Sequence, residues 1–195
     1  VGWPDRPPAG PFSAYTDYVA PRFSALSILA ALDHRRRTGQ GQYIDQSQAE
    51  ATLHLLSPAL LDYTVNGRLP SGMGNRDPEM APHGIYPAQG EDRWLALAVH
   101  TDQQWQALCT VMNKQELAHD SRFATTATRL THQDELDEII SAWTRTQDRF
   151  AMEEQLQARG VAAGAVLGLY ELEHDQQLQH RGHFAPLEHH TLGQV

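Results

Sequence analysis

The first extended apolar pattern covers residues 20–37, where closely spaced hydrophobic side chains predict a helix that is largely buried. Its apolar positions are Phe23, Leu26, Ile28, Leu29, Ala30 and Leu32. Arginines occupy positions 35–37 and precede Thr38 and Gly39, so the last turn complements the helix dipole. Because glycine readily takes the left-handed conformation that ends many helices, the pattern also predicts the C-terminal end at Gly39.

A second helix is predicted after a short extended stretch. Residues 42–46 alternate around Tyr43 and Ile44, which predicts a short strand. Ser47 is a favourable N-cap, and Glu50 stands three residues later as its capping-box partner. We therefore expect a helix over residues 48–65. Pro58 should bend it or divide it, because proline lacks the amide hydrogen that a continuous helix uses.

Residues that terminate regular structure concentrate in positions 64–80, which are rich in Gly, Pro, Asn and Ser. The charge changes at the same place. Residues 1–63 carry 5 basic and 6 acidic side chains, whereas the remainder carries 10 and 18. We interpret residues 66–82 as a linker between two structural units, residues 1–65 and residues 83–195.

The second unit has the pattern of an α+β fold. Residues 84–87 and 94–99 flank a polar turn at 89–92 and predict a hairpin, with a further strand at 161–169. The strand at 94–99 is apolar on both faces, so we expect helices to cover it. The predicted covering helices are residues 102–112, 133–144 and 150–159, the last ended by Gly160.

Composition and charge exclude several classes of protein. The 195 residues are 41% hydrophobic with a net charge of −9, which is typical of a globular protein and unlike a general nucleic-acid binder. A single cysteine, Cys109, favours a reducing compartment, and no apolar run reaches the ~18 residues of a membrane span. We therefore expect a cytoplasmic protein with neither a membrane nor a nucleic acid as its partner.

Common catalytic and metal-binding signatures are absent. There is no dinucleotide or nucleotide phosphate-binding motif, no G-x-S-x-G and no H-E-x-x-H. The chain has 11 histidines, but His180 and His183 have no third ligand at a recognisable spacing, so we expect no metal site. Lys114 is the only lysine, which disfavours Schiff-base chemistry.

Asp17 is the strongest candidate for chemistry, and two interpretations remain open. It stands just before the predicted helix at 20–37, a natural N-cap position, and capping is the commoner role. A carboxylate fixed at a helix start is also placed where backbone amides stabilise an anion, which suits a nucleophile.

The linker region offers a second set of candidates. Gly72 and Gly74, with His83 and Gly84 ahead of the hairpin, could form a flexible cover that lines a substrate pocket. The simpler interpretation is a polar loop between units, in which His83 has a structural role.

Several segments together resemble the class III CoA-transferase family, also called the CaiB/BaiF family. They are GWPDRPPAGP, AYTDY, ILAALDHRRRTGQGQYID, SQAEATLHLL and GNRDPEMAPHGIYPAQGEDRWLALAV, which are spread over almost the whole chain. The resemblance implies transfer of CoA between carboxylic acids, with an acyl-CoA thioester as substrate and no tightly bound cofactor. It also implies that Asp17 is the nucleophile and passes through mixed-anhydride and aspartyl-CoA thioester intermediates.

The resemblance implies a larger architecture as well. Residues 1–65 correspond to the end of the first portion of a Rossmann-like large domain, and residues 83–195 to a small domain and the start of the return to the large one. Family members form interlocked homodimers. The chain therefore resembles an internal fragment, and apolar faces of its first unit should lie against other sequence or a second subunit.

Two other functions stay open at this stage. One is an acyl-CoA epimerase of the α-methylacyl-CoA racemase type, which moves an α-proton with paired acid and base residues. The other is a non-catalytic interaction module. The acyl donor, the acceptor acid and the CoA-binding residues are not specified by this sequence.

Overall fold

The computed structural model describes residues 2–10 and 14–194, in two compact units, Val1–Gly74 and Asn75–Val195. Each unit is described here by itself. The boundary between them falls inside the predicted linker at residues 66–82. Within the described ranges, no helix has both the length and the apolar character that crossing a membrane requires.

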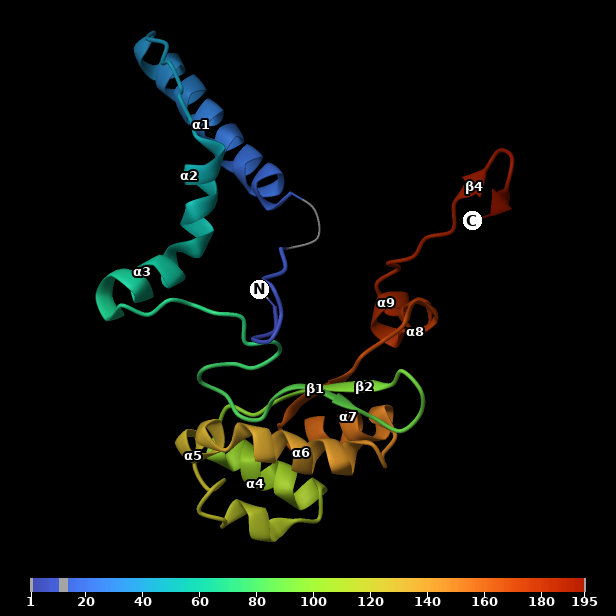
Figure 1. The fold of residues 1–195 in the computed structure, drawn as a ribbon. Helices are drawn as coiled ribbons and strands as arrows, with labels where there is room; N and C mark the ends of the chain where they lie inside the picture. Colours follow the sequence, from blue (N-terminus) through green and yellow to red (C-terminus); the bar gives the residue numbers. More distant parts are fainter. Residues whose placement is uncertain (1, 11–13, 195) are drawn as a thin grey trace. The chain divides into compact units, whose positions relative to one another are not determined.

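The first unit is helical (Figure 1). Its elements are α1 (Tyr15–Thr38), α2 (Gln48–Leu53), the 3-10 turn η1 (His54–Leu56) and α3 (Ser57–Asn66). The predicted C-terminal end of α1 is confirmed, because Gly39 has φ 76° and its N–H donates to the Arg35 carbonyl. The division at Pro58 is also confirmed: Pro58 lies in the first turn of α3, where its missing N–H costs nothing.

The strand predicted at residues 42–46 is wrong. These residues have no regular secondary structure, and Tyr43 is 92% exposed. An extended segment becomes a strand only where a neighbour satisfies its backbone groups, and neither of the described sheets includes this segment. The alternation around Tyr43 and Ile44 therefore belongs to a loop.

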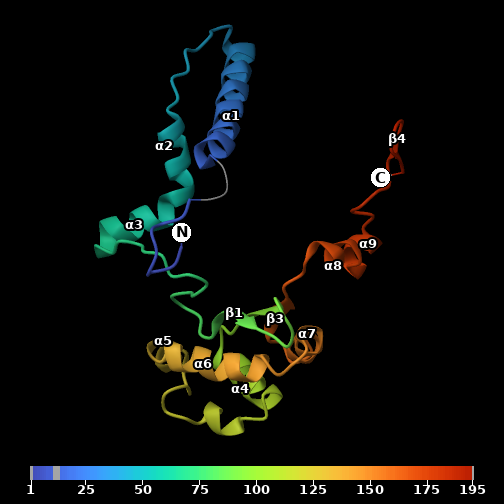
Figure 2. The ribbon, with the colours of Figure 1, turned by 45° about the vertical axis from the view of Figure 1, so that its right-hand side comes forward.

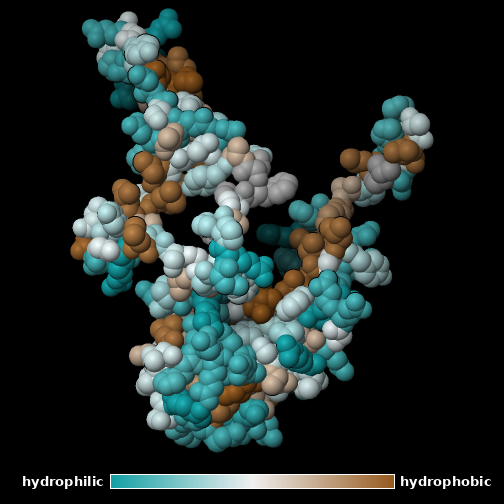
Figure 3. All heavy atoms as spheres, viewed as in Figure 1, coloured by the Kyte–Doolittle hydropathy of each residue, from teal (hydrophilic) through white to brown (hydrophobic). Residues whose placement is uncertain are grey.

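The prediction that α1 is largely buried is wrong for this chain. Val19 and Ala20 are its buried residues, whereas Leu26 and Leu29 are 63% and 64% exposed. Figure 3 shows hydrophobic side chains, in brown, on the outside of the helices of this unit. The exposed members on α2, η1 and α3 include Leu53, Leu55, Leu56, Leu60, Leu61 and Val65. The apolar spacing therefore predicted the helix correctly, but it did not show whether this chain buries the apolar side chains.

The second unit is built on a three-stranded antiparallel sheet in the order β1-β2-β3. Its strands are β1 (His83–Pro87), β2 (Trp94–Ala98) and β3 (Ala162–Ala165). The hairpin is confirmed, with Ile85 opposite Ala96, and Ala96 in turn opposite Gly164 on β3. The third strand is shorter than the 161–169 segment that predicted it.

Helices lie against one side of this sheet, as Figures 1 and 2 both show. They are α4 (Asp102–Val111), η2 (Gln115–Ala118), α5 (Thr126–Thr131), α6 (Gln133–Thr144) and α7 (Arg149–Gln157). After β3 the unit continues as α8 (Leu169–Glu173), α9 (Gln176–His180), β4 (Glu188–His189) and β5 (Gly193–Gln194). The predicted cover is confirmed for one face of β2, where Leu95 and Leu97 are buried in one core with Trp105, Phe123 and Ile140. On the other face Trp94 is 39% exposed.

A buried guanidinium ties this core together. Arg129 on α5 is fully buried, and its Nε donates to the Ala81 carbonyl at 2.6 Å while Nη1 donates to the Phe123 carbonyl at 3.0 Å. Its Nη2 reaches both Asp102 Oδ1 and Thr126 Oγ1 at 2.9 Å. One side chain thus connects the segment entering β1, the start of α4 and the start of α5.

Candidate functional site

Asp17 lies in the first turn of α1 and is exposed. Its N-cap role is wrong: Ala14 occupies the N-cap with φ −76° and ψ 95°, and no side chain caps the helix there. The backbone N–H of Asp17 donates to the Ala14 carbonyl at 3.0 Å. The carboxylate therefore does not cap the helix, and it contacts the first residue of α2 instead.

The partner of the Asp17 carboxylate is Gln48, the first residue of α2. Gln48 Nε2 donates one hydrogen bond to Asp17 Oδ1 and a second one, of 3.0 Å, to Thr16 Oγ1. Among the described residues, none donates to Oδ2 of Asp17. One carboxylate oxygen is thus held by an amide, while the other stays available.

The segment before α2 is fixed against α1 at two further points. Ser47 is extended, with φ −74° and ψ 129°, and its Oγ accepts from the backbone N–H of Glu50, which confirms the predicted N-cap. The reciprocal bond from the Ser47 N–H to the Glu50 side chain, which a capping box requires, is not formed among the described residues. Gln46 donates to the Ala20 carbonyl at 3.4 Å and accepts from Ser27 Oγ at 3.2 Å. These contacts hold Gln46 and Gln48, on either side of Ser47, against α1.

A pocket of about 300 Å³ opens beside Asp17. It is lined by Asp17, Ala20, Pro21, Ser24, Gln46 and Gln48. Asp17 is the ionisable side chain in this lining, so a carboxylate faces a space bounded by amides and a hydroxyl. A rigidly placed, accessible carboxylate of this kind can act as a nucleophile or as a base.

Gly72 and Gly74 do not line this pocket, and the structure gives each a packing reason. A Cβ on Gly72 would lie 2.5 Å from the carbonyl oxygen of Gly2, and a Cβ on Gly74 would lie 2.5 Å from the ring of Trp3. The N–H of Gly74 donates to the Gly2 carbonyl at 2.9 Å. The two glycines therefore allow the end of the first unit to pack against its own beginning.

Replacing Gly72 with alanine should open this contact. The added Cβ meets a backbone oxygen, which cannot move aside like a side chain, so we expect a loss of about 1–2 kcal/mol of stability. Amide hydrogen exchange at Gly74 should become faster. Gly10→Ala is the matched control, because nothing lies within 4 Å of a Cβ at that position. Unchanged exchange at Gly74 in Gly72→Ala would contradict the packing role.

His83 and Gly84 begin β1 in the second unit. His83 is half-buried, and its Nδ1 lies 2.6 Å from the Asn75 carbonyl. Because a carbonyl only accepts, Nδ1 is the donor in this contact. The contact joins the start of β1 to the start of the unit, which favours the structural interpretation of His83.

Cys109 is the single cysteine of the chain, and its surroundings make it unreactive. It is 1% exposed in the core of the second unit, and burial raises the pKa of its thiol to about 12. The thiolate needed for attack is therefore scarce at neutral pH. Within residues 2–10 and 14–194, no three His, Cys, Asp or Glu side chains gather as a metal site would require.

Comparison with known proteins assigns the chain to a family. The sequence profile described as "CoA-transferase family III" matches residues 1–195. The chain belongs to CoA-transferase family III. The resemblance carried by the sequence segments is thereby confirmed.

Named relatives support the assignment. The chain is 34% identical over its whole length to a succinyl-CoA–D-citramalate CoA-transferase of Chloroflexus aurantiacus, of which it covers 48%. It is 32% identical over 96% of its length to a succinate–glutarate CoA-transferase of Agrobacterium fabrum, of which it covers 46%. A solved CaiB/BaiF family protein from Brucella suis matches 96% of the chain with a TM-score of 0.80 and 29% identity, and the match covers 49% of that protein. The chain thus spans about half the length of the relatives it matches.

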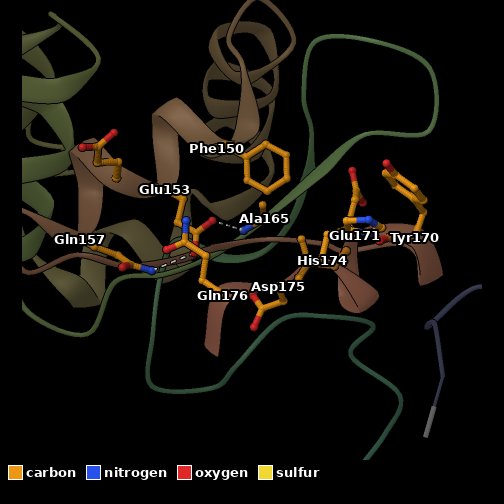
Figure 4. Close-up of a pocket in the computed structure, with 11 residues that line it drawn as sticks. Phe150, Glu153, Gln157, Ala165, Tyr170, Glu171, His174, Asp175 and Gln176 are labelled. Atoms are coloured by element: carbon orange, nitrogen blue, oxygen red, sulfur yellow. Dashed lines mark hydrogen bonds between the residues drawn. The ribbon is translucent and has the colours of Figure 1, made fainter. Parts of the chain in front are cut away.

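A second pocket, of about 730 Å³, lies within the second unit between α7, β3 and α8 (Figure 4). Its lining includes the carboxylates Glu153, Glu154, Glu171 and Asp175 and the aromatic rings of Phe150 and Tyr170. Glu153 accepts hydrogen bonds from Gln157 Nε2 and from the backbone N–H of Ala165. The lining is therefore predominantly acidic, although Glu171 is paired with Arg149.

The sequence pointed to Asp17 as a candidate but gave no indication of its contact with Gln48. Ser47, Gln48 and Glu50 were predicted only as the start of a helix. The available signal was the polar side chain of Gln48, which directly follows the N-cap serine at the start of the helix. No periodicity indicated that this start lies against the first turn of α1, because the two segments are 31 residues apart.

Proposed function

We propose that the protein containing this chain transfers CoA from an acyl-CoA thioester to a carboxylic acid, with Asp17 as the covalent nucleophile. The observation that supports this best is the geometry of Asp17. Its carboxylate is exposed at the start of α1, lies in a pocket and has one oxygen held by Gln48. Family membership supports the same reaction class.

The chemistry proceeds by successive acyl exchanges. Asp17 Oδ2 attacks the thioester carbonyl carbon, the C–S bond breaks, and CoA leaves as a thiolate with a mixed anhydride left on Asp17. The thiolate then attacks Asp17 Cγ and releases the donor acid as its carboxylate. The acceptor carboxylate displaces CoA from the aspartyl thioester, and the thiolate attacks the acceptor carbonyl to regenerate Asp17. The covalent route thus divides one difficult exchange into several easier steps.

The relatives suggest which acids to test. One relative is named for succinyl-CoA and D-citramalate, and another for succinate and glutarate. We propose dicarboxylic acids as acceptors, with succinyl-CoA as the first donor to test. The acyl-CoA is a substrate, and the proposal requires no tightly bound cofactor.

We also propose the larger architecture that the family resemblance implied. Residues 1–65 would belong to a Rossmann-like large domain and residues 83–195 to a small domain, joined by the linker 66–82. The exposed leucines on α1, α2 and α3 support additional sequence or a second subunit on these helices. An interlocked homodimer in the cytoplasm would provide that cover.

The direct test is capture of the aspartyl-CoA thioester in the full-length protein. The protein is incubated with succinyl-CoA and quenched with hydroxylamine, which converts an activated aspartyl group to its hydroxamate. We expect peptide mass spectrometry to locate the hydroxamate at Asp17. Transfer of CoA to a panel of dicarboxylates is followed in parallel by chromatography.

The same samples separate the alternatives. An epimerase would place solvent deuterium on the α-carbon of an acyl-CoA without any acceptor acid. A non-catalytic module would show neither transfer nor a modified aspartate. Either result would contradict the proposed CoA transfer.

A further inference from the structure

The orientation of the Gln48 side-chain amide follows from its partners. The Asp17 carboxylate only accepts hydrogen bonds, so the group facing it is the NH2 of Gln48 rather than the carbonyl. The same nitrogen donates its other proton to Thr16 Oγ1 at 3.0 Å. With both protons used on the first turn of α1, the amide is held in one orientation toward Asp17 Oδ1.

We propose that Gln48 is a catalytic oxyanion donor, which holds Asp17 for attack and stabilises the negative charge that forms on Asp17 Oδ1. This inference rests on the proposed CoA transfer. It assigns the two carboxylate oxygens different roles: Oδ2 forms and breaks bonds, whereas Oδ1 stays bound to Gln48.

The electron movements explain why a donor is needed at this oxygen. When the CoA thiolate attacks Cγ of the anhydride, a new S–Cγ bond forms and the π electrons of Cγ–Oδ1 move onto Oδ1. The electron pair on Oδ1 then re-forms the Cγ–Oδ1 π bond, the Cγ–Oδ2 bond breaks, and the donor leaves as a carboxylate that carries the bridging oxygen and the negative charge. Attack by the acceptor carboxylate on the thioester repeats the sequence, with the thiolate as leaving group. Both steps develop an oxyanion on Oδ1.

The hydrogen bond from Gln48 strengthens where catalysis needs it. In the anhydride and in the thioester, Oδ1 is a neutral carbonyl oxygen, whereas in each tetrahedral state it carries a full negative charge. A donor already in place gains most in the charged state and therefore lowers the barrier. Gln46 cannot substitute for it, because its amide is bonded to the Ala20 carbonyl and to Ser27.

The test compares two substitutions in the full-length protein. Gln48→Leu removes the donor, and we expect kcat to fall by roughly 10²-fold, the effect of losing one oxyanion donor, while KM for the acyl-CoA changes little. Hydroxylamine capture at Asp17 should slow in proportion. Gln42→Leu is the matched control, since Gln42 is exposed in the preceding loop and outside the pocket.

Gln48→Glu provides a pH-dependent readout that a residue without contact to Asp17 would not give. The introduced carboxyl donates only when protonated, and Asp17 attacks only when ionised, so the two carboxyls must share one proton. Asp17 is the ionisable group in the pocket lining, with Asp45 and Glu50 the nearest acidic residues along the chain. We expect the rate of Gln48→Glu to peak at acidic pH and to fall toward neutral pH, unlike wild type and Gln42→Glu.

The outcomes separate the inference from the function it rests on. A wild-type protein without CoA transfer and without a modified Asp17 overturns the proposed function. Wild-type transfer combined with an unchanged kcat in Gln48→Leu, or a change in KM alone, overturns the role of Gln48 only. If Gln48→Leu does not fold, the near-isosteric Gln48→Glu decides the matter, and a wild-type pH profile in that variant refutes the inference.

Discussion

Replacing Asp17 with asparagine is expected to abolish CoA transfer. Asparagine keeps the size of the side chain and an oxygen that Gln48 can bond, but its amide does not attack a thioester. We expect kcat to fall by roughly 10⁴-fold or more, the scale of nucleophile removal in enzymes that use covalent intermediates. No hydroxamate should form at residue 17. Steady-state kinetics and peptide mass spectrometry measure the two effects separately.

Asp33→Asn is the matched control for this experiment. Asp33 also lies on α1, where it pairs with Arg37 on the surface, and it is outside the pocket. The control should retain wild-type turnover, because exposed ion pairs contribute little to stability. An Asp17→Asn variant that still turns over near the wild-type rate would refute the covalent mechanism.

Replacing Arg129 with methionine is expected to destabilise the second unit more than any surface change. Methionine fills a similar volume but donates nothing, so the carbonyls of Ala81 and Phe123 lose their guanidinium donors. Leaving a buried acceptor without its donor costs about 1–3 kcal/mol, and two carbonyls are affected. For a chain of this size that lowers Tm by roughly 10 °C, measurable by circular dichroism.

Two further variants make the Arg129 experiment specific. Arg129→Lys keeps the charge but loses the planar fork that reaches two carbonyls and Asp102 together, so it should fall between wild type and methionine. Arg122→Met is the surface control, since Arg122 pairs with Asp120 and Glu135 in solvent. Equal Tm values for Arg129→Met and Arg122→Met would contradict the importance of the buried network.

Electrostatics around Asp102 are consistent with this network. Partial desolvation raises the pKa of the Asp102 carboxyl. The hydrogen bonds from Arg129 and Thr126 outweigh this effect and hold that pKa below its usual value. The hydroxyl of Thr126 donates to Asp102 at 3.1 Å. Asp102 therefore stays ionised at neutral pH and pairs with Arg129 at the start of α4.

Local patterns predicted much of the fold because the responsible forces act within a few residues. Helix ends at Gly39 and Gly160, the N-cap at Ser47 and the division at Pro58 depend on backbone conformation and nearby hydrogen bonds. Alternation and a turn predicted the hairpin of β1 and β2. The candidate Asp17 was likewise identified, although through family resemblance combined with its place near a helix start.

Other predictions failed where distant residues decide the outcome. Residues 42–46 alternate like a strand, yet no described strand pairs with them. Capping was one of the two interpretations left open for Asp17, but the helix begins earlier, at Tyr15, and the carboxylate accepts from Gln48. Arg129 carried no sequence signal, because its partners come from three separate segments.

The sequence by itself determined the principal helices, the hairpin and the family, because periodicity, capping and turn residues are local properties and the family motifs are linear. Only the tertiary structure decided which side chains meet. The Gln48 amide on Asp17 joins residues 31 positions apart, and the Arg129 contact to Ala81 joins residues 48 apart. Such contacts depend on how segments pack, and no pattern within either segment encodes them.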